Sequence, residues 1–176
     1  MTIREGLKME KTEFDQAVKA AADREGKYLT FALAGEEYGI GILKVKEIIG
    51  LMPITTVPQT PGYVKGVINL RGKVIPVADI RLKFGMEPIA YNDRTCIIVV
   101  EIAGADRTIL MGIVVDSVSE VLNVKASDIE DTPNFGSRLN TAFILGMAKI
   151  NGSVKILLDI DRVFREEDIT VLAQAS

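Results

Sequence analysis

The residues of this chain whose types could support acid–base chemistry are carboxylates near predicted turns and helix starts. Asp116, Glu120, Asp159 and Asp161 are the candidates, and two of them could act as general acid and general base. The chain has no histidine, which excludes a Ser-His-Asp triad, a Cys-His pair and a histidine-containing zinc site. Helix capping explains carboxylates at such positions without any reaction. We therefore expect no catalytic residue, no metal site and no cofactor.

Two further kinds of chemistry lack their sequence signals. The glycine-rich phosphate-binding strings G-x-x-x-x-G-K-[ST] and G-x-G-x-x-G do not occur. The single cysteine, Cys96, lies in an apolar run and cannot form an intrachain disulfide, so nothing indicates an oxidising compartment. These absences favour a protein that acts by binding.

Length and composition narrow the kind of partner. The chain has 176 residues, 48% of them hydrophobic and 26% charged, which is typical of one globular unit or two small subdomains. A net charge of -3 and an aromatic content of 6% argue against an oligonucleotide-binding barrel, which needs a basic groove and exposed aromatic residues. The apolar runs are too short to span a bilayer, and no signal peptide is visible, so we expect a cytoplasmic protein.

The elements that would position binding residues are mostly short strands. Apolar alternation at Leu29, Phe31 and Leu33 predicts a half-buried strand, and the β-branched runs at 95–102 and 108–115 predict buried strands. Turn residues predict hairpins around residues 70–73 and around Asn151-Gly152. Helical periodicity predicts a short helix over residues 42–49. Further short helices are expected after the capping residues Asp79 and Asp159.

Two segments of the chain recur without gaps. Residues 39–49 align with residues 112–122, and residues 66–84 align with residues 146–164. The repeat predicts two small β subdomains of similar topology, in halves at about 27–92 and 93–166. Each half is near the lower size limit for independent folding, so we expect apolar residues to be buried between them. Two small barrels side by side would leave a groove at their junction, where a partner helix could lie.

Several motifs in this order resemble the CheW family. They are E-Y-G-I at 37–40, G-V-I-N-L-R-G at 66–72, I-P-V at 75–77, D-I-R at 79–81 and V-V-D-S-V-S-E-V-L at 114–122. The resemblance runs from about Lys27 to Phe164. It implies a mainly β fold of two five-stranded SH3-like barrels related by an internal repeat, with short helices. Residues 1–26 would then be a helical or partly disordered extension, 27–166 the CheW-like domain, and 167–176 a C-terminal tail.

The resemblance also implies a function and partners. The protein would be a non-enzymatic adaptor that couples the cytoplasmic tips of methyl-accepting chemoreceptors to the regulatory domain of a CheA histidine kinase. It would reach membrane receptor arrays through these partners, without direct membrane insertion. The alternative is a related scaffold of a non-flagellar chemosensory system, such as one for surface motility.

Partner-binding positions transfer with the resemblance. Val45 and Ile48 match receptor-contacting apolar positions, and Val118 and Val121 match a second such pair at equivalent places in the repeat. Arg71, at a predicted turn tip, could offer its guanidinium to a partner's carboxylates or carbonyls. Core packing for the aliphatic residues and a solvated turn for the arginine are the alternatives. The full set of expected binding residues is Val45, Glu47, Ile48, Gly66, Asn69, Arg71, Val118, Glu120 and Val121.

Overall fold

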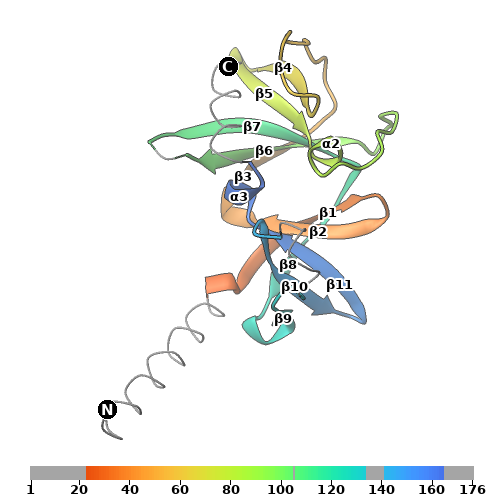
Figure 1. The fold of residues 1–176 in the computed structure, drawn as a ribbon, viewed down its shortest axis with the longest axis vertical. Coiled ribbons are helices and arrows are strands. Elements are labelled where there is room, and N and C mark those ends of the chain that lie inside the picture. The colour runs from red at the N-terminus through yellow and green to blue at the C-terminus, as the bar shows by residue number, and fades with distance from the viewer. Residues whose placement is uncertain (1–22, 105, 134–140, 165–176) are drawn as a thin grey trace, which may run out of the picture.

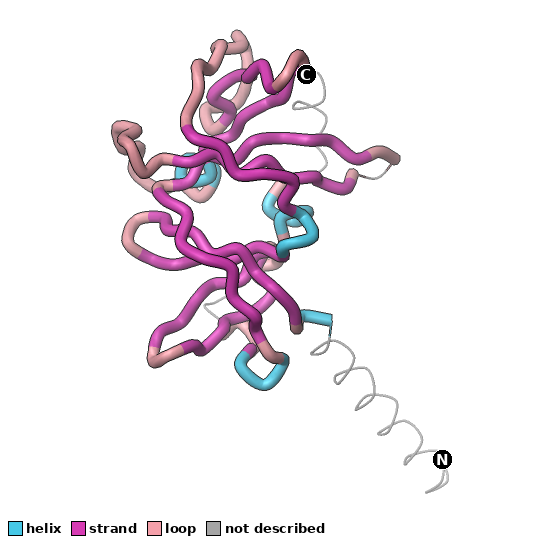
Figure 2. Tube along the Cα trace, turned by 180° about the vertical axis from the view of Figure 1, so that it is seen from behind, coloured by secondary structure: helices cyan, strands magenta, loops and turns pink. Residues whose placement is uncertain are grey.

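The computed structural model describes residues 23–104, 106–133 and 141–164. It contains two β-sheets, which lie one above the other along the long axis of the molecule (Figures 1 and 2). The expected C-terminal tail at 167–176 and most of the expected N-terminal extension lie outside the described residues. Within them the expectation of a mainly β protein with short helices is confirmed.

The lower sheet of Figure 1, called sheet A here, has six strands in the order β8-β1-β2-β11-β10-β9. Their bounds are β1 (Gly26–Leu33), β2 (Glu36–Gly41), β8 (Ser117–Val124), β9 (Ile129–Glu130), β10 (Ile144–Ile150) and β11 (Ser153–Leu158). Sheet A thus exceeds the expected five strands by the two-residue β9.

The upper sheet, called sheet B, has the expected five strands in the order β3-β6-β7-β5-β4. They are β3 (Val45–Gly50), β4 (Val64–Leu70), β5 (Lys73–Asp79), β6 (Cys96–Ala103) and β7 (Thr108–Val115). The short helices are η1 (Ile42–Lys44), α2 (Ile80–Lys83), η2 (Ala126–Asp128) and α3 (Ile160–Val163).

The two sheets exchange strands between the sequence halves. Strands β1 and β2 join the C-terminal strands in sheet A, while β3 to β7 form sheet B. The sheet boundary therefore does not fall near residue 92, where the repeat places the division into halves. The chain crosses between the sheets twice, through η1 and at Asp116. Parallel pairing of β2 with β11, and of β7 with β5, holds each exchanged strand in place.

The helix expected over residues 42–49 is wrong beyond its first three residues. Residues 42–44 form a 3-10 turn, and residues 45–50 form β3, which pairs antiparallel with β6. The β-branched residues Val45, Ile48 and Ile49 suit a strand better than a helix, and pairing with a neighbouring strand outweighs the local periodicity.

The largest apolar cluster lies between the two sheets, as the repeat predicts. It joins fully buried side chains of sheet A, such as Phe31 and Ile40, to side chains of sheet B, such as Ile98 and Val100. A smaller cluster lies within each sheet. Because so much of the core is shared, burial of apolar area stabilises the two sheets jointly.

The two expected helix caps are confirmed. The Asp79 carboxylate accepts hydrogen bonds from the backbone amides of Arg81 and Leu82 at the start of α2. The Asp159 carboxylate accepts one from the amide of Asp161 at the start of α3. Tyr91 also donates a hydrogen bond to Asp79 at 2.8 Å.

Candidate partner-binding site

The two predicted apolar pairs occupy matching positions on the edge strands of the two sheets. Val45 and Ile48 lie on β3, and Val118 and Val121 lie on β8. The inner residue of each pair, Val45 or Val118, is partly buried against the between-sheet cluster. The outer residues reach solvent, because Ile48 is 44% exposed and Val121 is 50% exposed. Core packing alone therefore does not explain why the outer residues Ile48 and Val121 are apolar.

A β-bulge explains how residues three positions apart can share one face. On a regular strand, residues i and i+3 point to opposite faces. The register of β3 against β6 shifts between Val45 and Glu47, and the register of β8 against β1 shifts at the equivalent place. An extra residue at a bulge changes which side chains face the same way.

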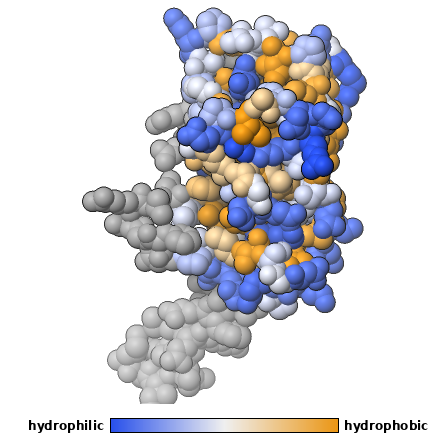
Figure 3. Space-filling model, turned by 90° about the vertical axis from the view of Figure 1, so that its right-hand side faces the viewer, coloured by the Kyte–Doolittle hydropathy of each residue, from blue (hydrophilic) through white to orange (hydrophobic). Residues whose placement is uncertain are grey.

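The strand register places both outer residues beside the between-sheet core. Ile48 pairs with Ile98, and Val121 pairs with Leu29, and both partners are buried members of that cluster. Cross-strand partners in an antiparallel pair share a face. Ile48 and Val121 therefore extend the shared core outward to the protein surface, one from each sheet. On the face drawn in Figure 3, hydrophobic residues also reach the surface in several separate places among hydrophilic ones.

A cavity of about 650 Å³ opens at one end of sheet B. Its apolar lining comes from strands of this sheet: Leu70, Ile75, Val99, Ile109 and Leu110. Its charged lining comes from Lys46, Glu47, Arg71, Lys73 and Glu101. Sequence reasoning missed this combination of an apolar floor and a charged rim, because the residues come from all five strands of sheet B and the sequence does not reveal how these strands pair.

The equivalent end of sheet A is built differently. At the positions that the repeat and the sheet register match to Ile75 and Leu110, sheet A has Lys155 and Glu37. These two side chains form an ion pair, and Lys155 is buried. An ion pair thus stands in sheet A where sheet B has the apolar floor of its cavity.

Arg71 and Glu47, both predicted site residues, meet at the rim of the sheet B cavity. Arg71 donates to both carboxylate oxygens of Glu47, from Nη1 at 3.2 Å and from Nη2. The hydrogen bonds from Arg71 hold the pKa of Glu47 below its ordinary value. Arg71 has a positive φ of 52°, and Asn69 accepts a hydrogen bond from the Gly72 amide across the same turn. The turn therefore presents the guanidinium in a fixed, two-point contact.

We expect Arg71→Gln to raise the pKa of Glu47 toward its ordinary value. The pKa of the paired carboxylate is lower in the folded than in the unfolded state. The pair therefore contributes its full stabilisation above the unfolded-state pKa of Glu47, and this stabilisation is lost as pH falls through the folded-state pKa. Carbon-13 NMR of the Glu47 carboxyl group measures this titration directly. Lys73→Gln is the matched control, since it removes one cation from the same rim without touching the pair. Equal Glu47 titration curves in the two variants would contradict the pairing.

Gly66 and Glu120, both expected binding residues, lie in different environments. Gly66 is buried, and its backbone passes so close to Thr55 that it shapes the fold rather than offering a contact surface. The backbone of Glu120 exchanges hydrogen bonds with the Thr30 hydroxyl, which leaves the Glu120 side chain exposed on β8. Only Glu120 of these two is therefore accessible to a partner.

Three of the four candidate acid–base carboxylates are engaged in structural contacts. Asp116 forms an ion pair with Arg81, Asp159 caps α3, and Asp161 forms an ion pair with Lys44. Neither the sheet B cavity nor a second cavity of about 310 Å³ near Leu51 is lined by any of the four. The described residues contain no group of three or more histidine, cysteine or carboxylate residues that could hold a metal ion. Among them there is also no helix long and apolar enough to cross a membrane.

Comparisons with known proteins agree with this architecture. The family model described as a CheW-like domain matches residues 27–168. The Chemotaxis protein CheW of Klebsiella aerogenes is 37% identical over 155 residues, covering 88% of this chain and 91% of that protein. Protein FrzA of Myxococcus xanthus is 26% identical, covering 79% and 84%. The crystal structure of the scaffolding protein TtCheW from Thermoanaerobacter tengcongensis superposes with a TM-score of 0.71 at 35% identity, covering 82% of this chain and 95% of that one.

Proposed function

The chain belongs to the CheW family, and from this membership we propose that it couples methyl-accepting chemoreceptors to a CheA-type histidine kinase in the cytoplasm, by binding alone. The observation that carries the proposal is the matched placement of two apolar pairs on the edge strands of the two sheets. In each pair the inner valine packs on the shared core, while Ile48 and Val121 remain exposed.

We propose that the receptor tip binds across these two edge strands. A helical hairpin presents an apolar stripe, and its aliphatic side chains would contact Ile48 on one sheet and Val121 on the other. The inner valines Val45 and Val118 would support this contact from the shared core. Glu120, which is exposed next to Val121, would set the register through polar contacts at the rim.

We propose that the kinase regulatory domain binds at the cavity end of sheet B. The apolar floor offers a place for an aliphatic side chain, and the Arg71–Glu47 pair gives the surrounding rim a defined arrangement of charge. Coupling follows if receptor states present their tips differently, because a bound partner shifts an equilibrium only through its different affinity for the two states.

We expect Ile48→Asp and Val121→Asp each to weaken receptor binding by about 30-fold, because each places a charge in an apolar contact. Isothermal titration of a receptor-tip helical hairpin into the purified protein measures the loss. Thermal unfolding should change little, since both side chains are partly exposed in the free protein. Binding of the kinase regulatory domain should be retained.

Ile89→Asp is the matched control for this experiment. Ile89 is 41% exposed, comparable to Ile48, but lies on the loop between α2 and β6. The control should bind the receptor hairpin as the natural chain does. If Ile48→Asp and Val121→Asp bind as tightly as the control, the receptor site is not on the edge strands.

The similarity to protein FrzA is the observation that favours the alternative, a scaffold of a non-flagellar system. Identity to the chemotaxis protein CheW of Klebsiella aerogenes is higher, at 37% against 26%. This difference favours the chemotaxis system. Deleting the gene and assaying swimming in a nutrient gradient and spreading on a surface separates the two roles.

A further inference from the structure

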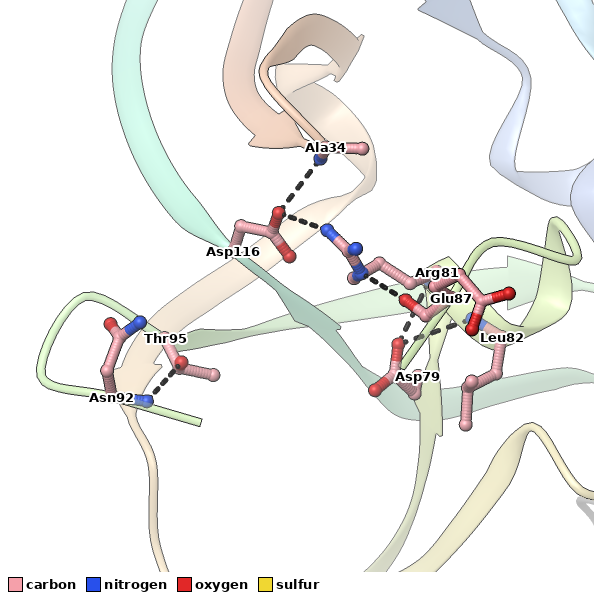
Figure 4. A network of polar contacts seen from close by, with 8 residues as sticks. All are labelled: Ala34, Asp79, Arg81, Leu82, Glu87, Asn92, Thr95 and Asp116. Atoms are coloured by element: carbon pink, nitrogen blue, oxygen red, sulfur yellow. Dashed lines mark hydrogen bonds and ion pairs between the residues drawn. The ribbon is translucent and has the colours of Figure 1, made fainter. Parts of the chain in front are cut away.

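Two ion pairs bridge the sheets at the two points where the chain crosses between them. At the crossing between β7 and β8, Asp116 Oδ2 binds Arg81 Nη1 of α2 at 2.6 Å (Figure 4). At the crossing between β2 and β3, Lys44, the last residue of η1, binds Asp161 of α3 at 2.8 Å. Helix α2 follows strand β5 of sheet B, and α3 follows strand β11 of sheet A. Each pair therefore joins a helix of the sheet that the chain leaves to the crossing itself.

Each pair also reaches the sheet that the chain enters. The Asp116 carboxylate accepts a hydrogen bond from the amide of Ala34, in the β1–β2 turn of sheet A, at 2.9 Å. The Asp161 carboxylate accepts one from the amide of Ala103, at the end of β6 in sheet B, at 2.9 Å. The two arrangements thus have the same three parts: a helix, a crossing and a backbone amide of the opposite sheet.

The charges of the two arrangements are reversed. Arg81 and Asp161 occupy equivalent positions of the repeat, but the first places a cation on the helix and the second an anion. The crossing residue carries the complementary charge in each case, Asp116 or Lys44. The same type of ion pair is therefore formed at both crossings, although the helix carries the positive charge in one and the negative charge in the other. This recurrence indicates that an ion pair between helix and crossing stabilises the fold at both places.

We propose that these two clamps, Arg81–Asp116 and Lys44–Asp161, are positioning residues that set the angle between the sheets, and thus the spacing of the two apolar pairs. Apolar packing between the sheets is non-directional and tolerates sliding. Charge-assisted hydrogen bonds fix a distance and a direction. A rotation of one sheet against the other would separate the acid of each clamp from its cation or from the backbone amide that it accepts from.

The two clamps differ in exposure. The Arg81 and Asp116 side chains are 10% and 20% exposed, whereas those of Lys44 and Asp161 are 30% and 33% exposed. Arg81 is held additionally by its Nε, which donates to the Glu87 carbonyl at 3.0 Å. Water screens the Lys44–Asp161 ion pair more strongly, so we expect this clamp to break before the Arg81–Asp116 clamp does. Both side chains of the Lys44–Asp161 clamp are partly exposed, so a bound partner can reach them.

The test is a distance measurement between the sheets in the full chain. Spin labels are attached to cysteines introduced by Lys73→Cys and Ser153→Cys, equivalent hairpin positions of sheet B and sheet A, in a Cys96→Ser background. We expect one narrow distance distribution. Lys44→Gln should broaden or shift it. Asp161→Asn, which keeps an acceptor for the Ala103 amide, should do the same.

Lys46→Gln is the matched control, because it removes an ion pair with Glu101 that lies within sheet B. It should leave the distance distribution unchanged. Thermal unfolding of all variants shows whether a change reflects the angle or a loss of folding. If Lys44→Gln and Asp161→Asn keep the narrow distribution of the natural chain while folded, the clamps do not set the angle.

The link from sheet angle to the apolar pairs rests on the proposed function, but the distance measurement needs no partner. Failure of receptor binding would therefore leave the clamp result standing. Where both hold, Lys44→Gln should also weaken binding of the receptor hairpin, by about fivefold, without altering any residue of the two apolar pairs.

Discussion

Gly66→Ala is expected to lower the free energy of unfolding by about 3 kcal/mol. Gly66 has a positive φ of 141°, which L-residues rarely adopt, and a Cβ there would stand 2.0 Å from the Thr55 carbonyl oxygen. That oxygen accepts a hydrogen bond from the Val67 amide, and the Thr55 amide donates to the Val67 carbonyl. Alanine would therefore strain the backbone and displace the β3–β4 loop from β4. Urea unfolding followed by circular dichroism measures the change.

Gly62→Ala provides the matched control for Gly66→Ala. Gly62 is exposed, lies in the β3–β4 loop just before β4, and a Cβ added to it would meet no atom within 4 Å. We expect Gly62→Ala to stay within about 0.5 kcal/mol of the natural chain. Equal stability of the two alanine variants would show that Gly66 is not held in this close approach.

Phe31→Ala is expected to lower the free energy of unfolding by about 4 kcal/mol, with the whole chain still unfolding in one transition. Phe31 is fully buried in the between-sheet cluster, stacks on Tyr38 with ring centroids 6.0 Å apart, and pairs across strands with Val118. Removing it leaves a cavity in the core that both sheets share. Because neither sheet has a comparable core of its own, both should be destabilised together.

Amide hydrogen exchange tests this shared destabilisation, because it reports on each strand separately. Protection of β1 in sheet A and of β6 in sheet B should fall by the same free energy in Phe31→Ala. Phe31→Leu, which keeps most of the buried volume, should cause a smaller loss, about 1.5 kcal/mol. A loss confined to sheet A would show that the sheets are independent folding units.

Local features of the fold could be predicted because their causes lie within a few neighbouring residues. Asn151-Gly152 gives a two-residue hairpin, where Asn151 has a φ of 50° and Gly152 a φ of 78°. Asp79 and Asp159 cap helices because their carboxylates reach the next amides. The repeat predicted a core between two similar units, since short segments must bury their remaining apolar faces together.

The exchange of strands between the halves could not be predicted from local sequence. Strand β2 pairs with β11 only because the chain crosses between sheets at η1, and the parallel register that results joins residues more than 100 positions apart. The periodicity of residues 42–49 even suggested a helix at this crossing. Residues 45–50 form a strand instead, because they pair with β6. The local sequence of one segment does not show which distant strand it will pair with.

The candidate site was predictable in part. The repeat and the resemblance predict Val45, Ile48, Val118 and Val121 as binding residues. The bulges that put each pair on one face appear only in the strand register. The cavity rim of sheet B and the two clamps depend on side chains from distant strands. The one sequence signal for the clamps was the pair of equivalent positions Arg81 and Asp161, whose opposite charges gave no reason to group them.

The most direct test of the central claim is a methyl NMR titration of this protein with a receptor-tip helical hairpin. Isoleucine and valine methyl groups are labelled in the natural chain, so no substitution disturbs the surface. We predict that the methyl signals of Ile48 and Val121 shift together at one affinity, while those of Ile89 remain in place. Shifts confined to other methyl groups, with Ile48 and Val121 unmoved at saturation, would contradict a receptor site across the two edge strands.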